Sequence, residues 1–318
     1  MSLGWAIETR ALAKRFGSVE AVAGIDLHVE TGSVFGFLGP NGAGKTTTIR
    51  MLVGLMRPTA GSVSVLGSPV RPGAVDLTGV GALVERPAFY PYLSAVDNLR
   101  LFAAERGTPG AEARRQIGEA LERTGLTPVA GRKVGGYSTG MRQRLGLALA
   151  MLHRPRLVIL DEPTNGLDPA GVVEVRTIIG EMARDGMTVF LSSHVLSEIE
   201  QVCDRVAVLR HGRIVADGAT AELLGTGGSL FLRFDTPTET EAATALLAGR
   251  GLVAHGVDGT APGLAVDVPP TDGSRVARLL GEGGLYPAEL SVRRRSLEDV
   301  FLELTRDDPG ATGGGAHE

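Results

Sequence analysis

The sequence predicts an α/β protein whose core is a parallel β-sheet. Short apolar runs that resemble buried strands alternate along the chain with segments whose apolar residues recur at helical spacing. A glycine-rich turn also joins one of these strands, residues 34–38, directly to a helix. Loops at the carboxyl ends of parallel strands are where such sheets bind their ligands. We therefore expect a ligand site at this glycine-rich turn.

Composition and charge restrict the possible functions. A length of 318 residues suggests two domains, or one large domain with an appendage. The net charge of −4 argues against a nucleic-acid binder. Cys203 is the only cysteine, which excludes a disulfide and a cysteine-based metal site and fits a reducing cytoplasm. No apolar run approaches the ~18 residues that span a bilayer, and the first residues lack a signal-peptide pattern. We expect another protein to supply any membrane-spanning part.

The elements of the first two thirds follow in order. Residues 5–65 indicate strands, then a helix after Gly44 that Pro58 ends, then another strand. After them we expect a mostly helical stretch, a helix, a buried strand, a helix, a strand, a short helix and a hairpin, at residues 94–125, 138–153, 157–160, 170–184, 188–191, 194–202 and 205–216.

The last third reads as a second domain. Gly, Thr and Ala dominate residues 218–228, so we place a boundary near residue 225. A strand at 230–234, a helix at 237–249, two further strands and a helix are expected before a last helix that follows Ser296. The tail, 307–318, is rich in glycine and is expected to be disordered.

The glycine-rich turn matches the spacing of a phosphate-binding loop. Glycines allow consecutive backbone N–H groups to point at phosphate oxygens, and the following helix adds its positive end. In this pattern Lys45 reaches the β- and γ-phosphates and Thr46 binds Mg²⁺. The alternative is a glycine-rich turn that only caps a helix. The predicted phosphate-binding residues are Gly39, Asn41, Gly42, Ala43, Gly44, Lys45, Thr46 and Thr47.

Two carboxylates end a second buried strand. Asp161 and Glu162 follow the apolar run at residues 157–160. Because strand ends of a parallel sheet meet at one edge, both lie near the phosphate-binding loop. Asp161 is predicted to hold Mg²⁺, and Glu162 to orient or deprotonate the attacking water.

The motifs together resemble the nucleotide-binding subunits of ATP-binding-cassette (ABC) transporters. The phosphate loop, Asp161-Glu162, a Ser-Thr-Gly segment at 138–140, Gly-Leu-Asp at 166–168 and His194 stand in the family's order and spacing. The resemblance covers residues 5–220 and implies an ABC ATP-binding domain: a P-loop NTPase core with an antiparallel β subdomain and a helical subdomain. Residues 225–306 then form a small C-terminal α+β domain.

The segment at residues 137–141 resembles the family's signature sequence. Ser138 and Gly140 match the common pattern, whereas Thr139 and Met141 depart from it. Alone, the segment indicates a helix capped by a serine. In the family these residues contact the γ-phosphate that is bound to the partner subunit. The resemblance therefore implies a head-to-tail pair, a homodimer by expectation, that holds two ATP molecules and their Mg²⁺.

Four further residues take roles from the resemblance. Asp168 resembles the dimer-contact loop, and His194 the switch histidine at the γ-phosphate. Phe16 resembles the aromatic that stacks on adenine, although it could instead belong to the core. Glu85 stands where the family usually has glutamine near Mg²⁺ and the γ-phosphate, and resembles bacitracin- and lantibiotic-type exporters.

The resemblance implies that ATP closes the pair and hydrolysis reopens it, which drives a separate transmembrane permease. The short single cassette and Glu85 favour export of a drug or antibiotic peptide, as in bacitracin, lantibiotic and daunorubicin exporters. The chain would be cytoplasmic, bound at the membrane's cytoplasmic face through its permease. The alternatives are an importer's ATPase, expected to carry a C-terminal β-barrel, and a soluble ABC protein of translation or DNA repair.

Two surface features stay open at this stage. For the aromatic residues Phe89, Tyr90, Tyr92 and Phe102 there are two compatible interpretations: they receive a helix of the membrane partner, and they form the core of the helical subdomain. The arginine run at residues 293–295 either faces a partner or anionic lipid, or is a solvated surface.

Overall fold

The computed structural model describes residues 4–71, 77–84, 88–224, 228–257, 263–294 and 296–306. The chain forms two compact units, Met1–Ala219 and Thr220–Glu318, which are described separately. The assignment of an ATP-binding domain to residues 5–220 and of an accessory domain to 225–306 stays a prediction. The predicted tail at 307–318 lies outside the described residues.

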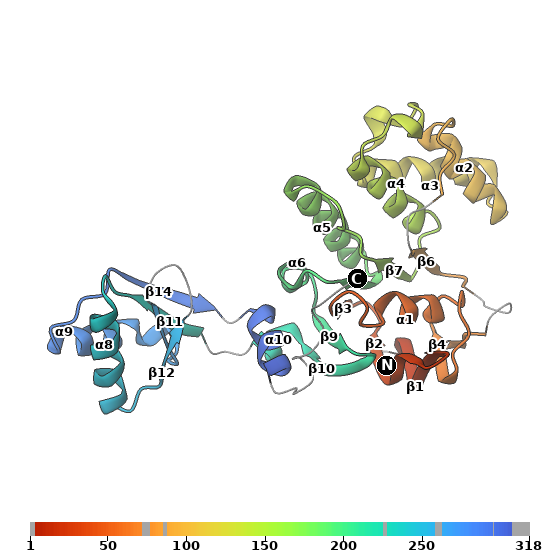
Figure 1. Ribbon diagram of the computed structural model, residues 1–318. Helices are drawn as coiled ribbons and strands as arrows, with labels where there is room; N and C mark the ends of the chain where they lie inside the picture. The colour runs from red at the N-terminus through yellow and green to blue at the C-terminus, as the bar shows by residue number, and fades with distance from the viewer. Residues whose placement is uncertain are drawn as a thin grey trace, which may run out of the picture. The chain divides into compact units, whose positions relative to one another are not determined.

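The first unit is built on a six-stranded sheet of the order β10-β9-β3-β8-β7-β6 (Figure 1). Only β10 is antiparallel to its neighbour, and the other five strands are parallel. The uninterrupted apolar runs of β3 and β7 explain their position, because strands inside such a sheet are buried on both faces. The predicted parallel α/β core is confirmed. The strands are β3 (Val34–Leu38), β6 (Val80–Leu83), β7 (Leu157–Asp161), β8 (Thr188–Ser193), β9 (Arg205–Arg210) and β10 (Arg213–Ala219).

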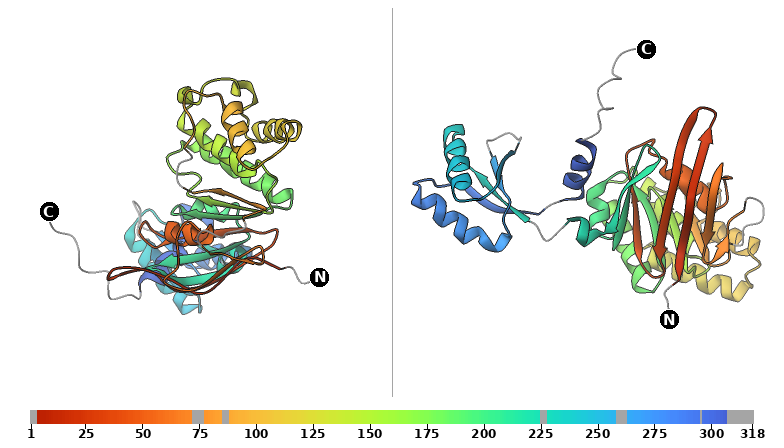
Figure 2. Two further views of the ribbon diagram at one scale, coloured as in Figure 1. Left: turned by 90° about the vertical axis from the view of Figure 1, so that its right-hand side faces the viewer. Right: turned by 90° about the horizontal axis from the view of Figure 1, so that it is seen from below.

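A second, antiparallel sheet of the order β2-β1-β4-β5 packs with α1 against the central sheet. Figure 2 shows its long β1–β2 hairpin at the outside of the unit. Phe35, Phe37 and Phe190 fill the core between the layers, with Phe35 and Phe190 stacked at 5.8 Å between ring centroids. The four strands are β1 (Trp5–Phe16), β2 (Val19–Glu30), β4 (Ala60–Val65) and β5 (Ser68–Pro69).

Helix α1 (Lys45–Leu52) is shorter than predicted. We expected Pro58 to end it, but the helix stops at Leu52, and Gly54 then adopts a positive φ of 72°. The N–H of Gly54 donates to the carbonyl of Met51. This bond gives a partner to one of the carbonyl groups that have none within the last turn of the helix. A glycine in left-handed conformation therefore ends the helix before the proline can.

A group of helices forms the helical subdomain around its own core. The predicted aromatic cluster divides between two environments. Phe89 and Phe102 pack edge to face within this core, at 6.3 Å between centroids. Tyr90 and Tyr92 are 46% and 63% exposed and lie against each other at the surface. The helices are α2 (Ala95–Glu105), α3 (Gly110–Arg123), the 3-10 turns η1 (Thr127–Val129) and η2 (Val134–Gly136), and α4 (Thr139–Met151).

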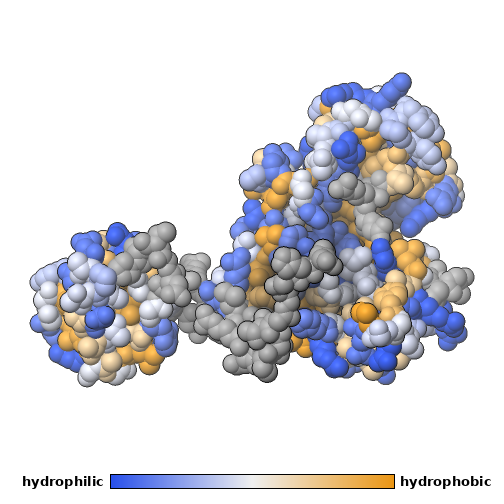
Figure 3. Space-filling view, viewed as in Figure 1, coloured by the Kyte–Doolittle hydropathy of each residue, from blue (hydrophilic) through white to orange (hydrophobic). Residues whose placement is uncertain are grey.

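Two more helices complete the first unit, α5 (Pro169–Arg184) and α6 (Leu196–Glu200). Both follow strands of the central sheet, as the alternating pattern predicted. Among the described residues, no helix is both long and apolar enough to cross a bilayer. Figure 3 shows hydrophilic surface with smaller apolar patches on the visible face of each unit.

The second unit is an α+β domain with a four-stranded antiparallel sheet of the order β12-β13-β11-β14. The sequence predicts three strands in this unit and no strand at residues 289–294, so β14 is a strand that the prediction lacks. The elements are α7 (Thr220–Leu224), β11 (Gly228–Arg233), α8 (Pro237–Gly249), β12 (Ala254–Val257), β13 (Gly263–Val266), η3 (Pro270–Asp272), α9 (Gly273–Glu282), β14 (Glu289–Arg294) and α10 (Leu297–Arg306).

Candidate nucleotide-binding site

The glycine-rich loop between β3 and α1 surrounds a cavity of about 340 Å³. Gly44 precedes the helix with a φ of 109°, and a Cβ atom there would lie 2.4 Å from the carbonyl oxygen of Ala21. Only glycine fits this position. Because α1 begins at Lys45, its first N–H groups have no partner within the helix and are available to an anion. The cavity is lined by Ala21, Asn41, Gly42, Gly44, Lys45, Thr46, Thr47, Glu162 and Asn165.

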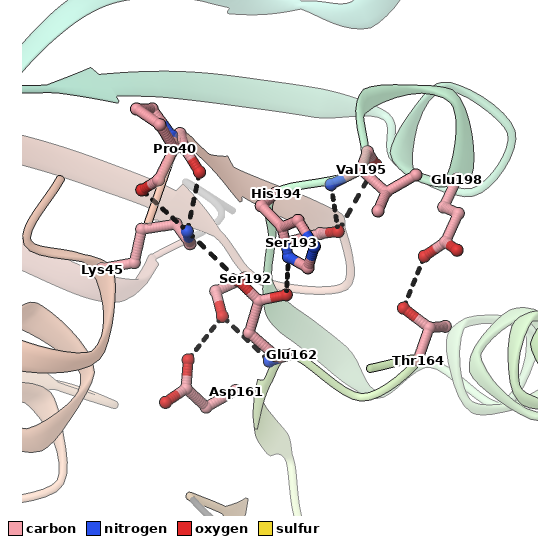
Figure 4. Close-up of polar contacts among 11 residues, drawn as sticks. Pro40, Lys45, Asp161, Glu162, Thr164, Ser192, Ser193, His194, Val195 and Glu198 are labelled. Carbon is pink, nitrogen blue, oxygen red and sulfur yellow. Dashed lines mark hydrogen bonds and ion pairs between the residues drawn. The ribbon is translucent and has the colours of Figure 1, made fainter. Parts of the chain in front are cut away.

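The Lys45 side chain lies on this loop and is only 5% exposed. Its Nζ donates to the carbonyl oxygens of Gly39, at 2.7 Å, and Pro40, at 3.2 Å. It also forms an ion pair with Glu162, at 3.1 Å between Nζ and Oε1 (Figure 4). The ammonium group is thus held by oxygen atoms at the edge of the cavity, where phosphate oxygens can replace the carboxylate as its partner.

Glu162 is held from two sides. Its Oε1 faces Lys45, and its Oε2 lies 2.7 Å from Nδ1 of His194. The backbone at Glu162 has a φ of 49°, which a non-glycine residue adopts at a cost of about 1–3 kcal/mol. Such strain persists only where surrounding contacts hold the residue in place, and it is common at functional sites. The structure therefore brings together Lys45, Glu162 and His194 from three different segments.

Ser192 joins the two carboxylate residues, and the sequence had not singled it out. Its Oγ donates to Oδ1 of Asp161 at 2.6 Å and accepts the N–H of Glu162 at 3.0 Å. The cause is the register of the sheet, which pairs Asp161 on β7 with Ser192 on β8. The serine is fully buried. Its position two residues before His194, on a predicted strand, is the signal that could have identified it.

The oxygen atoms near the loop suit Mg²⁺. Thr46 lines the cavity, and Asp161 ends β7 at the same edge of the sheet as the loop. A hydroxyl and a carboxylate are hard oxygen ligands of the kind that Mg²⁺ uses together with substrate phosphates. Ser192 fixes one oxygen of Asp161, which leaves the other available. Glu85, the third predicted metal ligand, lies outside the described residues.

The predicted signature residues line a different cavity, of about 330 Å³. Ser138 caps α4, and its Oγ accepts the N–H of Met141 at 3.2 Å. Asp168 caps α5 in the same way, accepting the N–H of Gly171 at 3.0 Å. This cavity and the one at the glycine-rich loop have no lining residue in common. The cavity at the signature residues is lined by Ser138, Thr139, Gly140, Arg144, Gly166, Leu167, Asp168, Ala170, Gly171 and Glu174.

Tyr137 anchors the signature segment to the helical subdomain. The side chain is 3% exposed, and its hydroxyl donates to the carbonyl oxygen of Val129 at 2.8 Å. Burial raises the pKa of this phenol, an effect that the nearby Arg132 partly opposes. The residue therefore stays a neutral donor that fixes where Ser138 begins α4.

Phe16 and Ala43 lie apart from the cavity lining. Phe16 ends β1 and is 48% exposed, so the alternative that it belongs to the core is wrong. The Nζ atom of Lys14 lies 5.1 Å from the centre of its ring. An exposed ring suits stacking against a base. Ala43 belongs to the loop itself; it is buried in the core and does not line the cavity.

Comparison with known proteins matches the arrangement to a family. Residues 22–165 match the family model described as ABC transporter. The chain is 37% identical to the bacitracin transport ATP-binding protein BcrA of Bacillus licheniformis, over 94% of this chain and 96% of that protein. It is 39% identical to the daunorubicin/doxorubicin resistance ATP-binding protein DrrA of Streptomyces peucetius, over 94% and 92%. A solved ATP-binding subunit of an ABC transporter is 29% identical, covers 69% of this chain and 91% of its own, and superposes with a TM-score of 0.60.

Proposed function

We propose that this chain, which belongs to the ABC transporter ATP-binding family, pairs with a second copy of itself and drives a separate transmembrane permease that exports a drug or an antibiotic peptide. The family binds and hydrolyses ATP.

The separation of the two cavities carries the proposal. The phosphate loop and Glu162 line one, whereas Ser138, Gly140 and Asp168 line the other. The N-terminus of α4 has backbone N–H groups that suit an anion, and none of its residues lines the cavity at the phosphate loop of its own chain. A second copy placed head to tail supplies these groups to the γ-phosphate. Two copies then make two complete sites.

Within each site, the contacts of Glu162 suggest its task. With ATP bound, phosphate oxygens take over Lys45, and the Glu162 carboxylate becomes free to accept a proton from water. His194, hydrogen-bonded to that carboxylate, orients it. Thr46 and Asp161 would hold Mg²⁺, which supplies charge stabilisation to the transferred phosphoryl group.

The relatives support export. The names of two of them refer to bacitracin transport and to daunorubicin/doxorubicin resistance. The importer alternative predicted a C-terminal β-barrel, whereas the described part of the second unit is a four-stranded sheet with helices. We place the chain at the cytoplasmic face of the membrane, held there by the permease. Tyr90 and Tyr92, exposed on the helical subdomain, are candidate contacts with it.

Substitution of Ser192 by alanine tests the positioning of the two carboxylate residues. It leaves Asp161 Oδ1 and the N–H of Glu162 without their buried partner, at a cost of about 1–3 kcal/mol of folding stability. We expect the Mg²⁺ concentration for half-maximal ATPase activity to rise about tenfold, since 1.4 kcal/mol is a factor of ten. Ser193→Ala is the control, because the Ser193 hydroxyl bonds only to the backbone of Val195 among the contacts described. Equal shifts in both variants would remove this role from Ser192.

Isolation of the chain from membranes of its own host tests the permease. We expect a polytopic membrane protein to co-purify with the tagged chain, and to be lost in Tyr92→Asp, because a charge there disrupts an apolar contact. The control is Tyr286→Asp, which changes a tyrosine that is 77% exposed on the second unit. Co-purification of ribosomes or repair proteins, with no membrane protein, would contradict the transport function.

A further inference from the structure

The outer strand of the C-terminal sheet, β14, is hydrogen-bonded on one side only. It pairs there with β11, and no other strand among the described residues lies beside it. Its six residue pairs with β11 run without a register shift, and its sequence, ELSVRR, contains neither proline nor lysine. Edge strands that avoid pairing with other chains usually carry a bulge, a proline or charged side chains, lysine above all. The charges of β14, at residues 289, 293 and 294, are of both signs, so they do not repel a second copy of the strand. Within the described part of the chain, β14 therefore presents a regular edge with no strand against it.

Two apolar side chains of β14 are partly uncovered. The register sets Leu290 opposite Leu232 and Val292 opposite Leu230, so all four lie on one face. Leu230 and Leu232 are fully buried, whereas Leu290 and Val292 are 37% and 49% exposed. The side chains that bury this face of β11 thus cover the same face of β14 only in part. Another strand beside β14 would extend this apolar face.

We propose that β14 pairs with β14 of a second copy of this chain, antiparallel and about a two-fold axis at Ser291. In this register Leu290 faces the second copy's Val292. Glu289 faces position 293, where the sequence has an arginine. Apolar thus meets apolar at positions 290 and 292, acid meets base at positions 289 and 293, and serine meets serine at the axis. The strand is complementary to itself, as a two-fold interface requires.

This self-complementarity favours a second copy over a strand of another protein. The axis at Ser291 matches the charges and the apolar residues at once. Glu289 also pairs with Arg233 of its own chain at 3.4 Å and accepts a hydrogen bond from Ser291 at 3.1 Å. Six-residue strands cover less surface than a stable interface needs, so the contact alone is weak, with a Kd on the order of 10–100 µM. The association needs no nucleotide.

Within the ATPase pair, this contact has a distinct consequence. The contact between cassettes depends on ATP, whereas the contact between β14 strands does not. Linking two weak contacts in one chain raises the effective concentration of the second to about the millimolar range. While the β14 contact is formed, it would therefore favour renewed closure of the cassettes when ATP binds again. This role rests on the proposed function, but the association itself does not.

Sedimentation velocity of the full-length, nucleotide-free chain, from about 1 to 200 µM, tests the proposal. We expect a concentration-dependent dimer that Val292→Lys weakens at least about tenfold, because the second copy would have to cover an unpaired charge. Val253→Lys is the matched control. Val253 is 56% exposed and precedes β12, the opposite edge of the sheet, so its substitution is expected to leave the dimer unchanged.

A charge exchange identifies the register. Arg293→Glu alone sets like charges opposite each other and weakens the dimer, whereas adding Glu289→Arg restores opposite charges and the dimer with them. Glu289→Arg also removes the pair with Arg233 of its own chain, so thermal unfolding of each variant is the check that the sheet stays intact. A chain that is monomeric throughout the range would overturn the proposal, as would a dimer that Val292→Lys and Val253→Lys affect equally. ATP-dependent pairing is measured separately in Glu162→Gln. Its persistence in Glu162→Gln/Val292→Lys supports two independent contacts, and its absence in Glu162→Gln alone counts against the proposed function only.

Discussion

A Glu162→Gln chain is expected to bind ATP at least as well as the unmodified chain and to hydrolyse it about 10²–10⁴ times more slowly. Glutamine has the same shape, but it cannot accept the proton of the attacking water, and general-base catalysis contributes a factor of this size. Lys45 also loses its ion-pair partner at 3.1 Å and meets the phosphates without competition. Steady-state ATPase rates and equilibrium nucleotide titration measure the two effects.

The matched control for this variant is Glu181→Gln, which makes the same chemical change on the surface of α5. Glu181 has a weak ion pair with Arg184, at 4.0 Å, and lies on no lining of the nucleotide cavity. Exposed ion pairs of this kind contribute little to stability. The ATPase rate of Glu181→Gln is therefore expected to stay within about twofold of the rate of the unmodified chain. If Glu162→Gln also turned over at near-normal rates, Glu162 would not be the catalytic base.

A Lys45→Ala chain is expected to lose about 10²- to 10⁴-fold in ATP affinity. Each hydrogen bond to a charged group is worth about 1.5–3 kcal/mol, and the ammonium group can contact two phosphates. Because the side chain is buried against the carbonyls of Gly39 and Pro40, no neighbouring cation can replace it. Titration with a fluorescent ATP analogue measures the loss, with thermal unfolding as the check that the chain is folded.

Lys133→Ala is the control for the lysine substitution. Lys133 is exposed and contributes a backbone bridge to Ser94, which alanine retains. We expect its ATP affinity to match that of the unmodified chain. An unchanged affinity in Lys45→Ala would mean that the loop at residues 39–47 is not the phosphate site.

The pattern of the sequence predicted the central sheet because its signals are local. The apolar run before Asp161 is enough to predict a buried strand, and the glycine turn before Lys45 is enough to predict a phosphate-binding loop. That both meet at one edge follows from parallel pairing alone. Ser192 could not be identified in this way, because its partners come from the register between β7 and β8, which no local pattern encodes.

The errors have equally physical causes. The proline at position 58 suggested the end of α1, but Gly54 in left-handed conformation ends the helix at Leu52. The strand β14 was not predicted because it ends in the arginines at 293 and 294. In the sequence, arginines on an edge strand cannot be distinguished from a solvated run of charges. Glu85, the most informative departure from the family, lies outside the described residues, and its role stays a prediction.

The central claim is that each ATP site is completed by a second copy. The most direct test is the mass in solution of Glu162→Gln with ATP and Mg²⁺, measured by light scattering at about 1 µM, below the Kd of the weak contact between β14 strands. We predict a particle of twice 33.1 kDa that holds two ATP molecules, and a monomer without nucleotide. A chain that binds ATP tightly and remains at 33.1 kDa would contradict the claim.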